Sequence, residues 1–173
     1  ETAISVIGNG VVIDPKALLK EIQYLFKQDI HPQLMISDRA HVIMPYHKQM
    51  DNALTNHQGA LAAGSTKRGI APVYADKMFR HGIRMVDITE PDIFKEKLHK
   101  SYNFNKKLLS AISDQIIQPD EKSIYEKYLQ YGKKLAPYIK DISLELYEAQ
   151  RNGKAILFEG AQGISLDIDH GIY

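Results

Sequence analysis

The sequence predicts an α/β fold with a mainly parallel sheet, because short β-rich runs alternate with longer segments of helical periodicity. Two of the runs, residues 4–7 and 155–158, each end in a glycine-rich turn, as strands do when ligand sites lie beyond their carboxyl ends. Residues 91–152 have helical character and predict a large insertion between the strands. Ligand sites are therefore expected in the turns rather than in the helices.

The amino-terminal part predicts strands at 4–7 and 33–36 with a helix between them. Asp14 is suited to cap this helix and Pro15 to begin it, because a proline at the first helical position loses no hydrogen bond. Apolar residues then recur on one face, which should pack against the sheet. These residues are Leu18, Leu19, Ile22, Leu25 and Phe26. A second helix is expected near residues 45–61.

Residues 59–72 predict an exposed loop, because they carry three glycines and little apolar periodicity. The next helix is expected to begin near Pro72 and to end near Gly82, which would adopt the left-handed conformation that often closes a helix. The segment from Thr89 to Asp92 resembles a capping box, in which Thr89 would be the N-cap of the helix that follows. The loop is the first candidate for a ligand site.

A long helical pattern runs from residue 120 to residue 150, with apolar and tyrosine side chains at spacings of three and four. Its members are Ile124, Tyr128, Tyr131, Leu135, Tyr138, Ile142 and Leu146. Pro137 should break or kink this helix. The tyrosines are expected in the core, with their hydroxyls at its edge, rather than as a platform that stacks on nucleic-acid bases.

The composition is that of an ordinary globular protein, with 44% hydrophobic and 25% charged residues. A formal charge of +1 gives no long-range attraction to nucleic acid. No apolar run approaches the roughly 20 residues that cross a membrane, so we expect neither kind of partner. Without cysteine or an export signal, the expectation is a cytoplasmic protein. The chain starts at Glu1, directly before a strand, and we expect it to be a piece of a longer protein.

The segment 64–69, GSTKRG, has the chemistry of an anion site. Glycines allow close backbone approach, hydroxyls donate and two cations neutralise, which suits a phosphate or a carboxylate. Its spacing differs from that of a nucleotide P-loop, so a solvated loop fits the pattern equally well. Arg68, Arg80 and Arg84 would converge on one anion if the following helix returned to the loop. The spacing alone favours the simpler role of cations at a helix end, where they stabilise the helix dipole.

The carboxyl-terminal residues offer two further candidates. Gln162 lies between two glycines after the strand expected at 155–158, where its amide would either bind the edge of a base or fix its own turn. Asp167, Asp169 and His170 are types of residue that bind metal ions, but their order favours a turn held by side-chain hydrogen bonds. Three histidines share no metal-ligand spacing, and we assign them no role: His41, His47 and His57.

Three segments, in this order, resemble the adenylosuccinate synthetases. They are residues 7–12 (IGNGVV), 64–72 (GSTKRGIAP) and 158–171 (FEGAQGISLDIDHG), and matches between them extend the resemblance over essentially the whole chain. The resemblance implies the P-loop-like fold of that family, of which only the central part would be present. It also implies a GTP-dependent ligase of AMP biosynthesis, which joins L-aspartate to inosine monophosphate (IMP) with Mg²⁺ and works as a homodimer with shared active sites.

The same resemblance implies roles for three residues. Thr66 would hydrogen-bond the 5′-phosphate of IMP, Gln162 would contact the base, and Arg80 would reach the IMP of the partner subunit. No catalytic residue and no metal ligand are implied within this chain, because the family's GTP and Mg²⁺ loop and its aspartate site would lie outside it, and the chain alone would be inactive. The implied division is 1–60 as a strand and helix part, 61–90 as an IMP-binding and dimer loop and helix, 91–152 as the helical insertion, and 153–173 as a strand and IMP-binding loop.

Two positions of the loop depart from the family pattern. Ser65 stands where threonine is usual, which keeps a hydroxyl, and Ala71 stands where glycine is usual, which narrows the permitted backbone angles. The alternative function is a non-catalytic module that binds a nucleotide or dimerises and retains the middle of the same fold.

Overall fold

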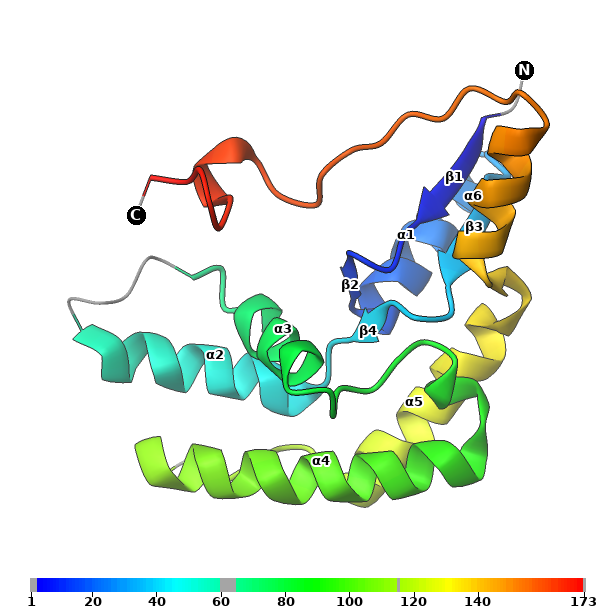
Figure 1. The fold of residues 1–173 in the computed structure, drawn as a ribbon. Helices are drawn as coiled ribbons and strands as arrows, with labels where there is room; N and C mark the ends of the chain where they lie inside the picture. The colour runs from blue at the N-terminus through cyan, green and yellow to red at the C-terminus, as the bar shows by residue number, and fades with distance from the viewer. Residues whose placement is uncertain (1–2, 60–64, 115, 173) are drawn as a thin grey trace.

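The computed structural model describes residues 3–59, 65–114 and 116–172, and it contains two parallel sheets with helices around them (Figure 1). The strands are β1 (Ile4–Ile7), β2 (Val12–Ile13), β3 (Gln33–Ser37), β4 (His41–Val42) and β5 (Ile139–Lys140). The larger sheet has the order β1-β3-β5, and β2 pairs with β4. All of these pairings are parallel, which confirms the predicted α/β class.

Strand β3 is the centre of the larger sheet. Its Gln33 lies opposite Ile4 of β1, and its Ile36 lies opposite Ile139 of β5. Ile36 is fully buried, as expected for a parallel strand with neighbours on both sides. Strand β5 belongs to the segment 91–152, for which the sequence predicts only helix. This segment therefore contributes to the sheet as well as covering it.

The helices are α1 (Pro15–Lys27), α2 (Pro45–Gln58), α3 (Ile70–Met78), α4 (Pro91–Ile112), α5 (Glu121–Leu135) and α6 (Ile142–Arg151), with short 3₁₀ helices η2 (Asp87–Thr89), η3 (Ala136–Tyr138) and η4 (Ile164–Leu166). Helix α1 begins as predicted, because the Asp14 carboxylate accepts from the backbone N–H groups of Lys16 and Ala17 at 3.0 and 3.3 Å. Its apolar stripe is only partly covered, since Ile22 is buried whereas Phe26 is 43% exposed. No helix of the described ranges is long and apolar enough to span a membrane.

Pro137 breaks the long helical pattern, as predicted. Helix α5 ends at Leu135, and the chain passes through η3 and β5 before α6 begins. The tyrosine side chains also behave as predicted. Tyr128 is 6% exposed and its hydroxyl donates to the Ile43 carbonyl at 2.8 Å, so the ring fills the core while its polar end finds a partner.

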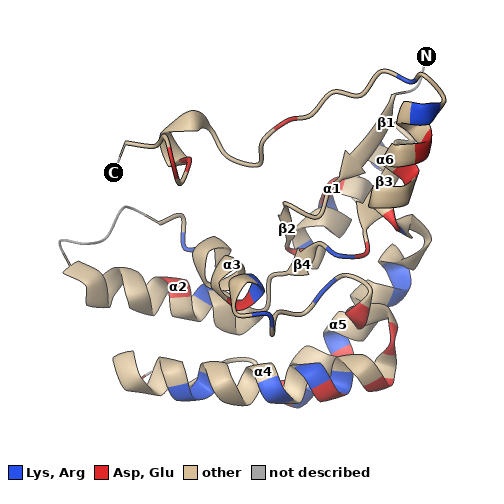
Figure 2. Ribbon diagram, in the orientation of Figure 1, with Lys and Arg blue, Asp and Glu red and all other residues tan. Residues whose placement is uncertain are grey.

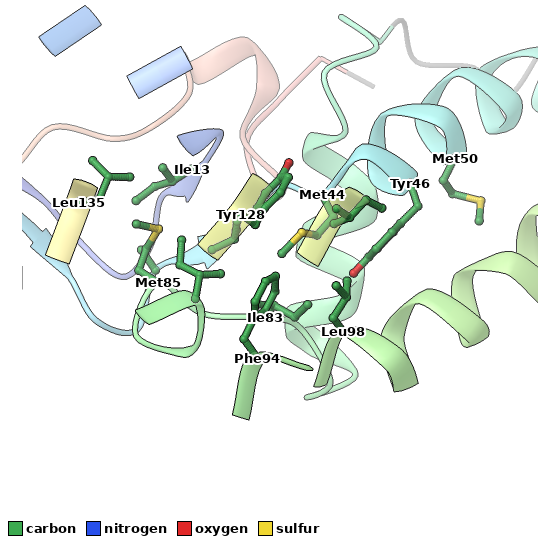
Figure 3. Packing of buried hydrophobic residues seen from close by; sticks show 14 of the residues in the cluster. Ile13, Met44, Tyr46, Met50, Ile83, Met85, Phe94, Leu98, Tyr128 and Leu135 are labelled. Atoms are coloured by element: carbon green, nitrogen blue, oxygen red, sulfur yellow. The ribbon is translucent and has the colours of Figure 1, made fainter. Parts of the chain in front are cut away.

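One cluster of buried apolar side chains joins the strands to the helices. Figure 3 shows Ile13, Met44, Ile83, Phe94 and Tyr128 meeting from β2, from the residue before α2, from the segment after α3, and from α4 and α5. Burial of such side chains is the main favourable contribution to folding. Because α4 and α5 share this cluster with the strands, the helical segment packs into one core with the amino-terminal part.

The N-cap predicted at Thr89 and the strand predicted at residues 155–158 are both wrong. Thr89 is not the N-cap of α4; it lies in η2, where its hydroxyl donates to the Val86 carbonyl at 2.7 Å, and Glu90 takes the cap position. Residues 155–158 form no strand with any described part of the chain, and Phe158 is 78% exposed. An apolar run becomes a strand only where a neighbouring strand supplies backbone partners and a packing surface. No described segment supplies them to these residues.

Candidate functional site

Asp51 holds the predicted anion loop in place. It lies on α2, is 5% exposed, and uses both carboxylate oxygens on the loop. Its Oδ1 accepts from the Ser65 hydroxyl at 2.6 Å, and its Oδ2 accepts from the Gly69 backbone N–H at 2.8 Å. The Ser65 oxygen also accepts from the Lys67 N–H at 3.0 Å. Thr66 therefore lies between two fixed points, and it is exposed.

The two unusual residues of this loop are accommodated. Ser65 supplies the hydroxyl for the hydrogen bond just described. Ala71 lies in the first turn of α3, in a helical conformation that any L-residue adopts. The glycine that the loop requires is Gly69, with a φ of 82° and so little room that a Cβ would lie 2.9 Å from the carbonyl carbon of His47. Gly64 lies outside the described residues.

Arg80 follows α3 in the left-handed conformation, with a φ of 66°. The sequence predicts that conformation for Gly82, so this prediction is wrong. The backbone N–H groups of His81 and Gly82 both donate to the Asp76 carbonyl at 3.1 Å, which closes the helix with Arg80 inside the turn. Gly82 is required for a different reason, because a Cβ there would overlap the His41 ring. The left-handed conformation costs an arginine about 1–2 kcal/mol, and such strain often occurs at functional positions.

A buried carboxylate in α3 ties α2, α3 and α4 together. Asp76 is 4% exposed and accepts from Nε2 of His47 at 2.9 Å, from Nε2 of His81 at 3.0 Å and from the Asn105 amide at 3.4 Å. Nδ1 of His47 accepts from the Met44 backbone N–H at 2.9 Å, so this ring is neutral with its proton on Nε2. Burial lowers the pKa of His47, which agrees with a neutral ring.

A cationic pocket of about 830 Å³ lies between the end of α3, β4 and α4. Its basic residues are Arg39, Lys77, Arg80, Arg84, Lys97 and Lys100, and the described residues that line it include no carboxylate. Figure 2 shows basic residues on α3, on the segment after it and on α4. Lys97 is paired with Asp87 at 2.7 Å. Arg80 and Arg84 form no ion pair within the described part of the chain, so both can take an anion from another molecule.

The pKa values of two pocket residues reflect burial first and this positive charge second. Burial, followed by the charges of Lys77 and Arg84, lowers the pKa of His41 to about 4. Burial and the charge of Arg84 also lower the pKa of Lys77. A neutral imidazole thus lies among ammonium and guanidinium groups, and an anion bound here would reduce the repulsion between them.

Helix α3 separates the predicted site residues into two groups. Thr66 and Arg68 precede the helix, whereas Arg80 and Arg84 follow it and line the pocket together. Arg68 is not among the described residues that line this pocket, whereas Arg80 and Arg84 both are, so the structure brings only these two arginines together there.

Gln162 lies in the exposed segment that leaves α6 and runs to the carboxyl end (Figure 1). Among the residues described, it forms no hydrogen bond with the loop or the pocket. The predicted turn after it is present, because Oδ1 of Asp167 accepts from the N–H groups of Asp169 and His170 at 2.9 Å each. These hydrogen bonds lower the pKa of Asp167. Within residues 3–59, 65–114 and 116–172, no three His, Asp or Glu side chains are placed to hold a metal ion.

Sequence reasoning missed the side chains that hold the site. His47 and Asp51 are four residues apart on α2 and therefore share one face of that helix. This spacing of a histidine and an aspartate, in a helix without a clear apolar stripe, was a usable signal. The link from His47 to Asp76 joins residues 29 positions apart, and no local pattern predicts it.

The sequence and the fold of this chain both match known proteins over nearly its whole length. The family model of adenylosuccinate synthetase matches residues 1–173. The adenylosuccinate synthetase of Clostridium kluyveri is 49% identical over 98% of this chain and 40% of its own length, and that of Clostridium acetobutylicum is 45% identical over the same shares. The structure of fully ligated adenylosuccinate synthetase from Plasmodium falciparum matches with a TM-score of 0.82 and 31% identity, over 97% of this chain and 39% of that one. The chain thus spans about 40% of the length of these curated relatives, and it belongs to the adenylosuccinate synthetase family.

Proposed function

We propose that this chain is the central part of a cytoplasmic, GTP-dependent ligase that forms adenylosuccinate from IMP and L-aspartate. The observation that carries the proposal is the family match over all 173 residues. Because the chain spans about 40% of its relatives' length, we assign the GTP, Mg²⁺ and aspartate sites to the rest of the enzyme. To this part we assign residues that bind IMP and contacts between the two subunits of a homodimer.

The chemistry requires IMP to be held firmly in place. The oxygen on C6 of the base is a poor leaving group until it is phosphorylated by GTP, after which the aspartate amino group attacks C6 and phosphate leaves. Thr66 donates to the 5′-phosphate, and the amide of Gln162 contacts the base near C6. Two observations support these roles: Thr66 lies exposed between two anchored residues, and Gln162 lies exposed in a glycine-rich segment. Positioning of this kind lowers the entropic part of the barrier.

We place Arg80 on the IMP of the partner subunit. Three features support this role: the pocket that Arg80 lines is cationic, Arg80 forms no ion pair with the described residues, and α3 separates Arg80 from Thr66. Its left-handed backbone, which is strained for an arginine, is compatible with a functional constraint at this position.

The experiment that tests the activity uses the full-length protein. Formation of adenylosuccinate should require IMP, L-aspartate and GTP together, and omission of any one should abolish it. A full-length protein that binds IMP but makes no adenylosuccinate would overturn the ligase proposal and support the alternative of a non-catalytic nucleotide-binding module. Calorimetry of this isolated chain with IMP separates the two further, because a self-sufficient module should bind IMP about as tightly as the full-length protein does.

Mixed dimers test the shared site. Arg80→Leu subunits and Gln162→Ala subunits are each expected to be nearly inactive alone. A dimer with one subunit of each kind contains one intact site, because the Arg80→Leu subunit keeps its own Gln162 and receives Arg80 from its partner. Random mixing gives about half mixed dimers with one of two sites intact, so about a quarter of the wild-type activity should return. No recovery would refute the contribution of Arg80 across the interface.

A further inference from the structure

We propose that Asp51 is a positioning residue for the phosphate of IMP, because it fixes residues 65–69 in the conformation that presents Thr66. The inference rests on the proposed function, and it adds a residue to which neither the motifs nor the resemblance assign a role. Asp51 itself does not touch the ligand. It acts through the loop.

The contacts of Asp51 close the loop from both ends. One oxygen takes the Ser65 hydroxyl at 2.6 Å and the other takes the Gly69 N–H at 2.8 Å, so a single carboxylate joins the first and last of five residues. Hydrogen bonds to a charged acceptor are among the stronger ones. The Asp51 carboxylate is 5% exposed, its bond from Gly69 is buried, and its bond from Ser65 is partly buried. The three residues between the anchors, including Thr66, consequently keep little conformational freedom.

The charge of Asp51 is turned away from a ligand on the outer side of the loop. Both of its oxygens face donors of the loop, on the side of α2, whereas Lys67 and Arg68 are exposed. In the described part of the chain neither of these cations forms an ion pair. An anion at Thr66 would therefore meet positive charge from the loop, with the carboxylate behind it.

Helix α2 gives this anchor a rigid base. One turn before Asp51, His47 donates to Asp76 of α3 at 2.9 Å, and Gly69 approaches the His47 backbone so closely that a Cβ would not fit without a shift. The end of the loop thus rests on the same helix that carries the anchor. A loop held in this way is pre-organised for its ligand, and release of the anchor should lower the population of the binding conformation.

The test measures steady-state kinetics in the full-length ligase. Asp51→Ala should raise the KM for IMP about ten-fold or more, because a loop that is competent one-tenth of the time binds ten-fold more weakly. The kcat and the KM values for GTP and aspartate should change by less than about two-fold. Asp51→Asn should restore most of the IMP affinity, because its carbonyl oxygen can accept from Gly69 while its amide donates to the Ser65 oxygen. Ser65→Ala removes one anchor and should give a smaller rise, about three-fold.

The matched control is Met50→Ala, which truncates the neighbouring buried residue of α2. Met50 is 5% exposed and belongs to the apolar core, so its truncation lowers stability without removing an anchor of the loop. The inference is overturned if Asp51→Ala raises the KM for IMP no more than Met50→Ala does, or if Asp51→Asn is as impaired as Asp51→Ala.

Failure of the proposed function gives a different result. If the wild-type full-length protein makes no adenylosuccinate, the ligase proposal fails. Amide hydrogen exchange then tests, independently of activity, whether Asp51 holds the loop. The Gly69 N–H should exchange at least about ten-fold faster in Asp51→Ala than in Met50→Ala, because its acceptor is gone. Equal exchange rates would show that Asp51 does not hold the loop.

Discussion

Replacement of His41 by phenylalanine should remove a specific acid sensitivity of the fold. His41 is 5% exposed, its Nδ1 has no hydrogen-bond partner among the described residues, and its ring packs on Gly82. Burial, together with the charges of Lys77 and Arg84, lowers its pKa to about 4, although Asp87 acts in the opposite direction. Phenylalanine offers a similar flat ring that never charges, and it removes a buried polar atom that has no partner.

The direction of the pH effect follows from which state binds the proton first. As the pH falls through 6.5 the unfolded chain protonates this histidine, whereas the folded chain does so only near pH 4. Stability that is fully present above pH 6.5 is therefore lost between pH 6.5 and 4. A pKa of about 4 against 6.5 corresponds to a total of about 3 kcal/mol at roughly 1.4 kcal/mol per pH unit. At pH 5 the loss is already about 2 kcal/mol.

The assay compares urea unfolding at pH 7 and pH 5. On going to pH 5, His41→Phe should gain about 2 kcal/mol in unfolding free energy relative to the wild type. Val42→Ala, a buried neighbour that does not titrate, should differ from the wild type by the same amount at both pH values. The His41 ring should titrate near pH 4 by NMR. A ring that titrates near 6.5, or a variant difference that does not change with pH, would refute the reasoning.

Three further substitutions test the packing and strain of the fold by urea unfolding. Arg80→Gly should stabilise the protein by about 0.5–1 kcal/mol, because glycine adopts the left-handed conformation freely. The same substitution should raise the KM for IMP. A lower stability of the variant would argue against backbone strain at Arg80. Gly132→Ala should destabilise the protein by about 1–3 kcal/mol despite alanine's preference for helix, because a Cβ would overlap the carbonyl of Ile88 in η2. A more stable variant would mean that η2 lies farther from α5 than the structure shows. Tyr128→Phe should cost about 1 kcal/mol through loss of the hydrogen bond to Ile43, and an unchanged stability would mean that this bond contributes nothing.

The features that the sequence predicts correctly depend on a few neighbouring residues. Asp14 caps α1 through N–H groups two and three positions away. Pro137 breaks its helix because its own ring lacks the N–H that the helix needs. The turn at Asp167 uses donors two and three positions away. In each case the interacting groups lie within three positions of one another, so a short sequence pattern is enough to predict the structure.

The features that it predicts wrongly or not at all depend on partners elsewhere in the chain. Strand β5 exists because β3 offers it an edge, and β3 is about a hundred residues earlier. Residues 155–158 have a suitable composition for a strand, but no described strand pairs with them. Gly82 was expected in the left-handed turn because glycine adopts it most easily, but the hydrogen bonds that close α3 onto the Asp76 carbonyl place the turn at Arg80, and Gly82 instead leaves room for the His41 ring.

In the candidate site, the exposed residues could be predicted from the sequence, whereas the buried residues that hold them in place could not. Thr66 and Arg80 stand out in the sequence because polar and cationic residues near glycines indicate a site, but the residues that fix them are buried and look like parts of the core. His47 and Asp51 hold the two ends of α3 from one face of α2, through Asp76 and Gly69. Under the proposed function, the loop serves the subunit's own IMP and Arg80 serves the partner's. The packing of α2 in one subunit would therefore set the geometry of that subunit's own IMP site and of its partner's IMP site. A change in the tilt of α2 would alter IMP binding at both.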